Sequence, residues 1–201
     1  GLLLLSKFEL KNKGQVDLTE VSTMLNRGII SAEISPEKND KKVRIYCGHL
    51  AENFEYYIPY PGASRSWEEE NFEQLKKSLN KITADQTTPT IVMGTLNCSL
   101  KIPEKRIFDI NAKSCEELAK NNFISALMST GANCTICPEN DLVRGAAQDA
   151  YMLDDIYFRG LTLLKTERNF TSAAELITKE GGKVTSNLST HFGVFTEFSL
   201  Y

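Results

Sequence analysis

The sequence lacks several features that would assign a function class directly. No stretch of its 201 residues approaches the roughly 20 consecutive apolar residues that cross a bilayer. A net charge of −3 gives no general electrostatic attraction to nucleic acid, and no internal repeat or low-complexity tract occurs. With 41% hydrophobic and 24% charged residues, the composition is typical of a globular protein. We therefore expect one domain spanning residues 1–201.

The beginning of the chain contains a short apolar run, "LLLL" at Leu2–Leu5. It is too short for the apolar core of a signal peptide, and Lys7 and Glu9 follow at once. The run predicts an interior strand, which needs neighbouring strands on both sides. Because the first residue is Gly1 and not Met, we expect a proteolytically processed chain. An N-terminal companion chain from the same precursor would supply the missing neighbours.

Cysteine usage and glycosylation acceptor sequences favour a secreted glycoprotein. Five cysteines leave at least one without a partner inside the chain. The Cys134-x-x-Cys137 spacing predicts a local disulfide, with a metal half-site or a redox pair as the alternatives. The Asn-x-Ser/Thr acceptor pattern occurs at Asn97, Asn133, Asn169 and Asn187.

Hydrophobic patterning predicts more strands than helices. Residues 27–35 and 42–50 form a two-strand pattern, whereas the polar residues 11–20 and the aromatic-rich residues 51–65 indicate loops. Helical spacing predicts a helix from about Ser66, and the capping box Ser114-x-x-Glu117 predicts a second helix. Residues 129–150 are irregular, two strands meet near Gly160, and a further strand ends the chain. This order predicts packed sheets covered by helices.

Polar residues follow several of the predicted strands. The only two histidines, His49 and His191, lie at strand ends, and Asp154 lies at the start of another strand. In the segment "TIVMGTLNCSL", strand alternation aims Thr95 and Asn97 the same way. A carboxylate that accepts a hydrogen bond from an imidazole fixes its tautomer and supports its charged form. A catalytic or binding site is therefore expected at these strand ends.

The order of the motifs resembles the endonuclease/exonuclease/phosphatase superfamily. The motifs are "GLLLLSKF", "NRGIISAEI", "VRIYCGHL", "GTLN", "LDDIYF" and "STHFGVFTEF". This group includes deoxyribonuclease I, exonuclease III-type repair nucleases, neutral sphingomyelinases and inositol polyphosphate 5-phosphatases. The resemblance implies an α/β (α+β) fold, a four-layer sandwich of two mixed sheets flanked by helices, incomplete here at its N-terminus.

The resemblance also implies roles for individual residues. His49 matches the histidine that donates to the phosphate, and Asn97 matches the asparagine of the Gly-Asp-x-Asn motif. Asp154 matches the aspartate that pairs with the second histidine, and His191 matches the histidine of the Ser-Asp-His motif. The family's upstream metal-binding Asn and Glu would precede Gly1.

Two departures from the family pattern affect the chemistry directly. Thr95 and Thr190 stand where the family has aspartates that orient the attacking water and assist the metal. A Thr hydroxyl is neutral near pH 7 and is a poor ligand for Mg²⁺, which favours carboxylate oxygens and water. Loss of a general base alone typically lowers the rate about 10²–10⁴-fold. We therefore expect an impaired or inactive enzyme, in which no metal ligand is assigned.

The vacated pocket has several candidate uses. Cys47 shares a strand face with His49 and is a candidate ligand for a haem or pigment. The aromatic residues of 51–65 suit a lipid-like or other small-molecule ligand, whereas nucleic acid is less favoured because few basic residues interleave with them. Alternatives are a Mg²⁺-dependent phosphodiesterase, either nuclease or sphingomyelinase-like, completed by an upstream segment or second chain, and a structural or storage glycoprotein.

Overall fold

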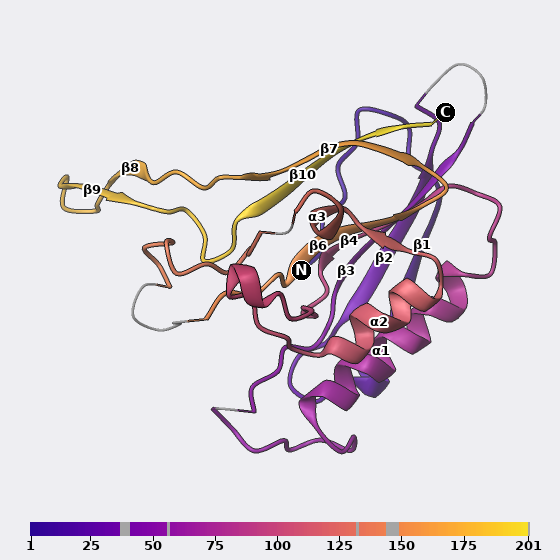
Figure 1. Ribbon diagram of the computed structural model, residues 1–201, viewed down its shortest axis with the longest axis horizontal. Helices are drawn as coiled ribbons and strands as arrows, with labels where there is room; N and C mark the ends of the chain where they lie inside the picture. Colours follow the sequence, from indigo (N-terminus) through magenta and orange to yellow (C-terminus); the bar gives the residue numbers. More distant parts are fainter. Residues whose placement is uncertain (37–40, 56, 132, 144–148, 201) are drawn as a thin grey trace.

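A six-stranded mixed sheet is the framework of the computed structural model (Figure 1), which describes residues 1–36, 41–55, 57–131, 133–143 and 149–200. Its strand order is β1-β2-β3-β4-β6-β5. The strands are β1 (Lys11–Asp17), β2 (Gly28–Ile34), β3 (Val43–His49), β4 (Thr90–Thr95), β5 (Ile124–Ser125) and β6 (Asp154–Arg159). The β3–β4 pair is parallel, and the other neighbouring pairs are antiparallel.

The two longest helices cover one face of this sheet, and a two-stranded sheet lies over part of the other face (Figure 1). Strand β7 pairs antiparallel with β10, and the β8–β9 hairpin extends away from the rest of the molecule. The bounds are α1 (Trp67–Ile82), α2 (Ala112–Lys120), α3 (Ala126–Ser129), β7 (Thr162–Asn169), β8 (Ala174–Ile177), β9 (Lys183–Ser186) and β10 (Gly193–Ser199), with 3₁₀ turns η1 (Thr19–Val21) and η2 (Pro103–Lys105). The mixed α/β class with more than one sheet is confirmed.

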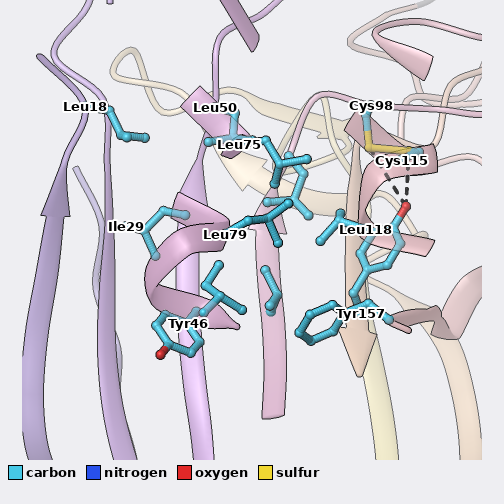
Figure 2. Packing of buried hydrophobic residues seen from close by; sticks show 14 residues of the cluster. Leu18, Ile29, Tyr46, Leu50, Leu75, Leu79, Cys98, Cys115, Leu118 and Tyr157 are labelled. Atoms are coloured by element: carbon cyan, nitrogen blue, oxygen red, sulfur yellow. Dashed lines mark hydrogen bonds between the residues drawn. A yellow bond between two sulfur atoms is a disulfide. The ribbon is translucent and has the colours of Figure 1, made fainter. Parts of the chain in front are cut away.

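The main core lies between α1, α2 and the sheet, as Figure 2 shows. Leu75 and Leu79 project from α1 toward Ile29 and Tyr46 of the sheet. Helix α1 begins where the spacing predicts, because the Ser66 side chain accepts a hydrogen bond from the Glu69 N–H at 3.1 Å. Three glutamates follow in its first turn, where the helix dipole favours negative charge.

The structure contains two disulfides. Cys134–Cys137 forms as predicted, and Cys98–Cys115 joins the loop after β4 to α2 inside the core (Figure 2). Cys47 is free, in agreement with the odd cysteine count. Disulfides persist in oxidising compartments, so this pattern is compatible with secretion. Among the described residues, no helix is both long and apolar enough to cross a membrane.

Several sequence predictions are confirmed. The two-strand pattern of residues 27–35 and 42–50 corresponds to β2 and β3, which pair antiparallel. The strands expected to meet near Gly160 are β6 and β7, although they enter different sheets. Gly160 has a φ of 72°, a conformation that favours glycine at this sharp turn. The predicted final strand is β10, whereas the β8–β9 hairpin was not predicted.

Three local predictions are wrong. Residues 11–17 form β1 instead of a loop, because an edge strand with mostly exposed side chains tolerates polar residues. The Leu2–Leu5 run forms no strand, since no described strand pairs with it, and Leu3 and Leu5 are 74% and 80% exposed. Helix α2 begins at Ala112, two residues before Ser114, whose hydroxyl donates to Asn71 instead of capping the helix.

The four glycosylation acceptor sequences differ in exposure. The asparagine side chains of two of them are buried, at Asn97 and Asn187, whereas Asn133 is exposed and Asn169 is half-buried. A glycan is bulky and needs surface position. Only Asn133 and Asn169 are therefore suited to carry one in the folded protein.

Asn71 of α1 ties two loops to the core, and its loss should destabilise the fold. Its amide donates to the backbone carbonyls of Ala51 (2.7 Å) and Leu96 (3.1 Å). We expect Asn71→Ala to lower the free energy of unfolding by about 2–4 kcal/mol, because buried carbonyls lose their donors. Urea denaturation measures this change. The matched control is Asn80→Ala on the exposed side of the same helix, and equal losses in both variants would contradict the prediction.

Candidate functional site

The ends of β3, β4 and β6 bring three predicted site residues to one edge of the sheet. In the strand register, Thr95 lies beside His49 on one side and beside Asp154 on the other. Gly94 permits this close approach, because a Cβ at its position would lie 2.1 Å from the carbonyl oxygen of Gly48. The close approach of the β3 and β4 backbones therefore sets the positions from which the His49 and Thr95 side chains extend.

Asp154 links Thr95 to His191 through both of its carboxylate oxygens. The Thr95 hydroxyl donates to Oδ1 at 2.6 Å, and His191 Nδ1 lies 2.6 Å from Oδ2. This hydrogen bond, together with the negative charges of Asp154 and Glu52, raises the pKa of His191, while burial opposes the shift. The predicted pairing of Asp154 with His191 is thus present in the structure, with Thr95 as its third member.

Asn97 lies behind this cluster and is almost completely buried. Strand β4 ends at Thr95, and Asn97 adopts a left-handed conformation with a φ of 53°, so strict strand alternation does not extend to it. Its Nδ2 donates to the Leu50 carbonyl at 2.8 Å, and its backbone N–H donates to the Leu153 carbonyl. Its Oδ1 is buried without a hydrogen-bond partner. Asn97 therefore ties the loops after β3 and β4 to the loop before β6.

His49 is close to these residues but belongs to a different set of contacts. Its Nε2 lies 3.6 Å from Glu52 Oε1, and Glu52 in turn lies 3.9 Å from Arg27. The neighbouring His49 ring lowers the pKa of Glu52, with a further contribution from Arg27, while burial acts in the opposite direction. The sequence analysis did not identify Glu52 as a site residue. Its position three residues after His49, just beyond the strand end, is the feature that could have indicated it.

A cavity of about 550 Å³ opens beside the Asp154–His191 pair. Its walls are mostly apolar, with polar groups gathered at the strand ends. The lining residues are Cys47, Met93, Gly94, Asp154, Asp155, Ile156, Phe170, Leu188, Ser189, His191, Phe192, Gly193 and Val194. The structure therefore places Cys47, His191 and Asp154 around one cavity, whereas His49 lines a second cavity of about 500 Å³ together with Leu2 and Ile30. Thr190 is exposed and lines neither.

Asp155 is a second carboxylate at this cavity, and sequence reasoning did not single it out. Burial raises its pKa to about 6, against the opposing hydrogen bonds from Ser125 and from the backbone N–H groups of Ile156 and Leu127. The structure thus places a second, buried carboxyl group with a raised pKa beside the cavity.

Solved structures with the same arrangement of strands and helices were found by comparison. SmcL aligns with a TM-score of 0.67 at 18% identity over 96% of this chain and 67% of SmcL. An endonuclease/exonuclease/phosphatase family protein from Bacteroides thetaiotaomicron aligns with a TM-score of 0.65 at 13% identity, over 96% of this chain and 66% of that protein. Beta toxin from Staphylococcus aureus gives 0.64 at 18% identity, over 96% and 65%.

The chain has the endonuclease/exonuclease/phosphatase fold. It spans about two thirds of the length of these similar structures. No protein-family model and no curated protein matches its sequence. At these low identities the likeness establishes the architecture and leaves the activity to be argued from the residues.

The side chains at the strand ends do not form a ligand set for the Mg²⁺ ion that this fold implies. Both oxygens of Asp154 are engaged by Thr95 and His191. Among the described residues, the one group of three His, Cys, Asp or Glu side chains close enough to share an ion is Cys134, Cys137 and Glu139, in a different loop. Mg²⁺ requires several oxygen ligands in octahedral geometry. The described residues at the strand ends do not supply such a set of oxygen ligands.

Asp154 should control the titration of His191. Because the folded-state pKa of His191 is raised, its ionisation stabilises the fold below about pH 6.5, and this stabilisation is lost as the pH rises through the folded pKa. We expect Asp154→Asn to lower the His191 titration midpoint and to cost most stability at mildly acidic pH. NMR titration of the His191 imidazole measures this, with His49→Ala for assignment of the resonances. An unchanged His191 midpoint in Asp154→Asn would contradict the prediction.

Proposed function

We propose that this protein is a catalytically impaired relative of the endonuclease/exonuclease/phosphatase enzymes whose former active-site pocket binds an amphipathic small molecule. One observation carries the proposal: Asp154 is held between a threonine hydroxyl and a histidine ring. By the resemblance of the sequence motifs, an aspartate would stand at the position of Thr95. The neutral hydroxyl can neither accept a proton from water near pH 7 nor add negative charge to hold a cation.

The cavity supports the amphipathic character of the ligand. Its volume of about 550 Å³ lies in the range of small-molecule sites, which combine apolar walls with a few polar groups. Met93, Ile156 and Phe192 would contact the apolar body of a ligand. His191, whose pKa is raised by Asp154, would contact an acidic or hydrogen-bond-accepting end. A lipid-like carboxylic acid has this chemistry.

Haem is a second ligand with this character. It combines an apolar macrocycle with carboxylates, and cysteine is one of the side chains that ligate its iron. Cys47 is the free cysteine, lines the cavity and is half-buried. Burial raises the pKa of its thiol, so thiolate ligation would have to offset that effect. The absorption spectrum of the protein purified from its source would show haem as a Soret band.

Binding of a fluorescent fatty acid tests the proposal. We expect 11-(dansylamino)undecanoic acid to bind saturably at one site, and Leu188→Asp at the exposed rim of the cavity to weaken binding at least about tenfold, because the charge repels the apolar chain. The matched control, Ile177→Asp, changes another exposed apolar residue, which lies on the β8–β9 hairpin. Absence of saturable binding, or equal weakening in both variants, would refute the proposal.

A working Mg²⁺-dependent phosphodiesterase completed by a companion segment is the second candidate. Retention of the Asp154–His191 pair favours it. So do two apolar features. One is a further cavity of about 380 Å³ whose lining includes Ile34, Ile91 and Leu164, and the other is the exposed pair Leu3 and Leu5 of the N-terminal run. A companion strand would cover these apolar side chains and would supply the missing acidic groups.

Hydrolysis of bis(p-nitrophenyl) phosphate separates the two candidates. For the impaired protein we expect no Mg²⁺-dependent turnover above the uncatalysed rate, with or without a companion chain. The second candidate requires a companion species in denaturing mass spectrometry of material from its source. It also requires Mg²⁺-dependent turnover that falls at least about 10³-fold in His191→Ala.

A further inference from the structure

Thr135, one of the two residues between the cysteines of the Cys134–Cys137 bridge, contacts both halves of the Asp154–His191 region. Thr135 is completely buried. Its hydroxyl oxygen accepts hydrogen bonds from the backbone N–H groups of Leu153 (3.0 Å) and Asp154 (3.1 Å). Its carbonyl oxygen accepts a hydrogen bond from the Phe192 N–H at 2.8 Å. One residue thus holds the backbone of Asp154 and the backbone directly after His191.

The loop that carries Thr135 is fixed from two sides. On one side the disulfide closes a ring of four residues around it. On the other side, the backbone of Thr135 and Ile136 is hydrogen-bonded to Tyr151, at distances of 2.8 to 3.1 Å. Opening the disulfide would remove the covalent restraint and leave Thr135 held by hydrogen bonds alone, those to Tyr151 and those to Leu153, Asp154 and Phe192.

Arg168 of β7 makes this bridge chemically different from Cys98–Cys115. Its Nη1 lies 3.1 Å from Cys137 Sγ and 2.9 Å from a Glu139 oxygen, and its guanidinium lies over the Phe192 ring, 5.3 Å from the centroid. A cation beside a sulfur stabilises the thiolate that leaves when a disulfide is reduced. Cys134 is partly exposed, whereas Cys98 and Cys115 are both buried in the core.

We propose that Thr135 is a positioning residue for Asp154 and His191 and that the Cys134–Cys137 bridge sets the position of Thr135. Reduction of this bridge by a dithiol then changes the contact between Asp154 and His191. A thiolate of the reductant attacks Cys134 Sγ, and Cys137 leaves as a thiolate beside Arg168. The second thiol of the reductant then attacks the mixed disulfide and releases Cys134. The reductant becomes a disulfide, two electrons enter the protein, and each cysteine sulfur takes up a proton at its own pKa. The proposal concerns the regulation of the proposed binding site.

The test reads His191 directly, by NMR titration of its imidazole, and so does not require a ligand. We expect Thr135→Val to lower the His191 midpoint by about half a pH unit or more, as the Asp154 contact loosens, and Thr135→Ser, which keeps the hydroxyl, to restore it. Mild dithiothreitol treatment should shift wild-type His191 in the same direction. The shift should be absent in Cys134→Ser/Cys137→Ser, which already shows the lowered midpoint. Mass spectrometry after alkylation confirms that Cys98–Cys115 stays oxidised.

An unchanged His191 midpoint after selective reduction overturns the proposal, even if Thr135→Val destabilises the fold. Reduction of both bridges at the same rate overturns the selectivity attributed to Arg168. Failure of fatty-acid binding in the oxidised wild type, together with the expected His191 shift, would refute the ligand proposal and leave this one standing. The two proposals are therefore tested separately.

Discussion

The parallel pairing of β3 with β4 is the constraint on which the candidate site depends. Parallel neighbours cannot be joined by a tight turn, so the chain must cross over one face of the sheet, and α1 makes this crossing. The crossing places Asn71 beneath the loops that follow both strands. The same pairing sets His49 beside Thr95, and the antiparallel β4–β6 register then sets Thr95 beside Asp154. Without this second register, the hydroxyl of Thr95 would not reach Asp154.

Features that depend on hydrophobic burial were predictable from the sequence. Hydrophobic periodicity predicted the strands around Ile30 and Ile45 and helix α1, and turn chemistry predicted the turn at Gly160. Contacts with neighbouring segments do not change these local preferences. The pairing of Asp154 with His191 was predicted only through the resemblance of motif order to a known superfamily. Both adjacent acidic residues line the cavity, but Asp154 is bonded to the histidine whereas Asp155 accepts a hydrogen bond from Ser125.

Features that depend on tertiary contacts were not predictable. Strand β1 is polar because it lies at an edge, a position that the sequence does not specify. Ser114 looks like a helix cap, but a neighbouring helix uses its hydroxyl. Glu52 and Thr135 lie in loops whose local sequences carry no site signature, and their relevance follows from what the fold brings beside them. Contacts between segments far apart in the chain therefore decide the details of the site.

The burial of Asn97 has a consequence for how the protein is made. Its amide lies inside the fold, next to the Cys98–Cys115 bond, yet its sequence is an acceptor for a sugar chain. An oligosaccharide on this nitrogen would occupy the space where Asn97 meets the Leu50 carbonyl. In a compartment that glycosylates such acceptors, folding and modification at this residue are mutually exclusive. Only molecules that enclose Asn97 before the transferase reaches it would attain the native structure.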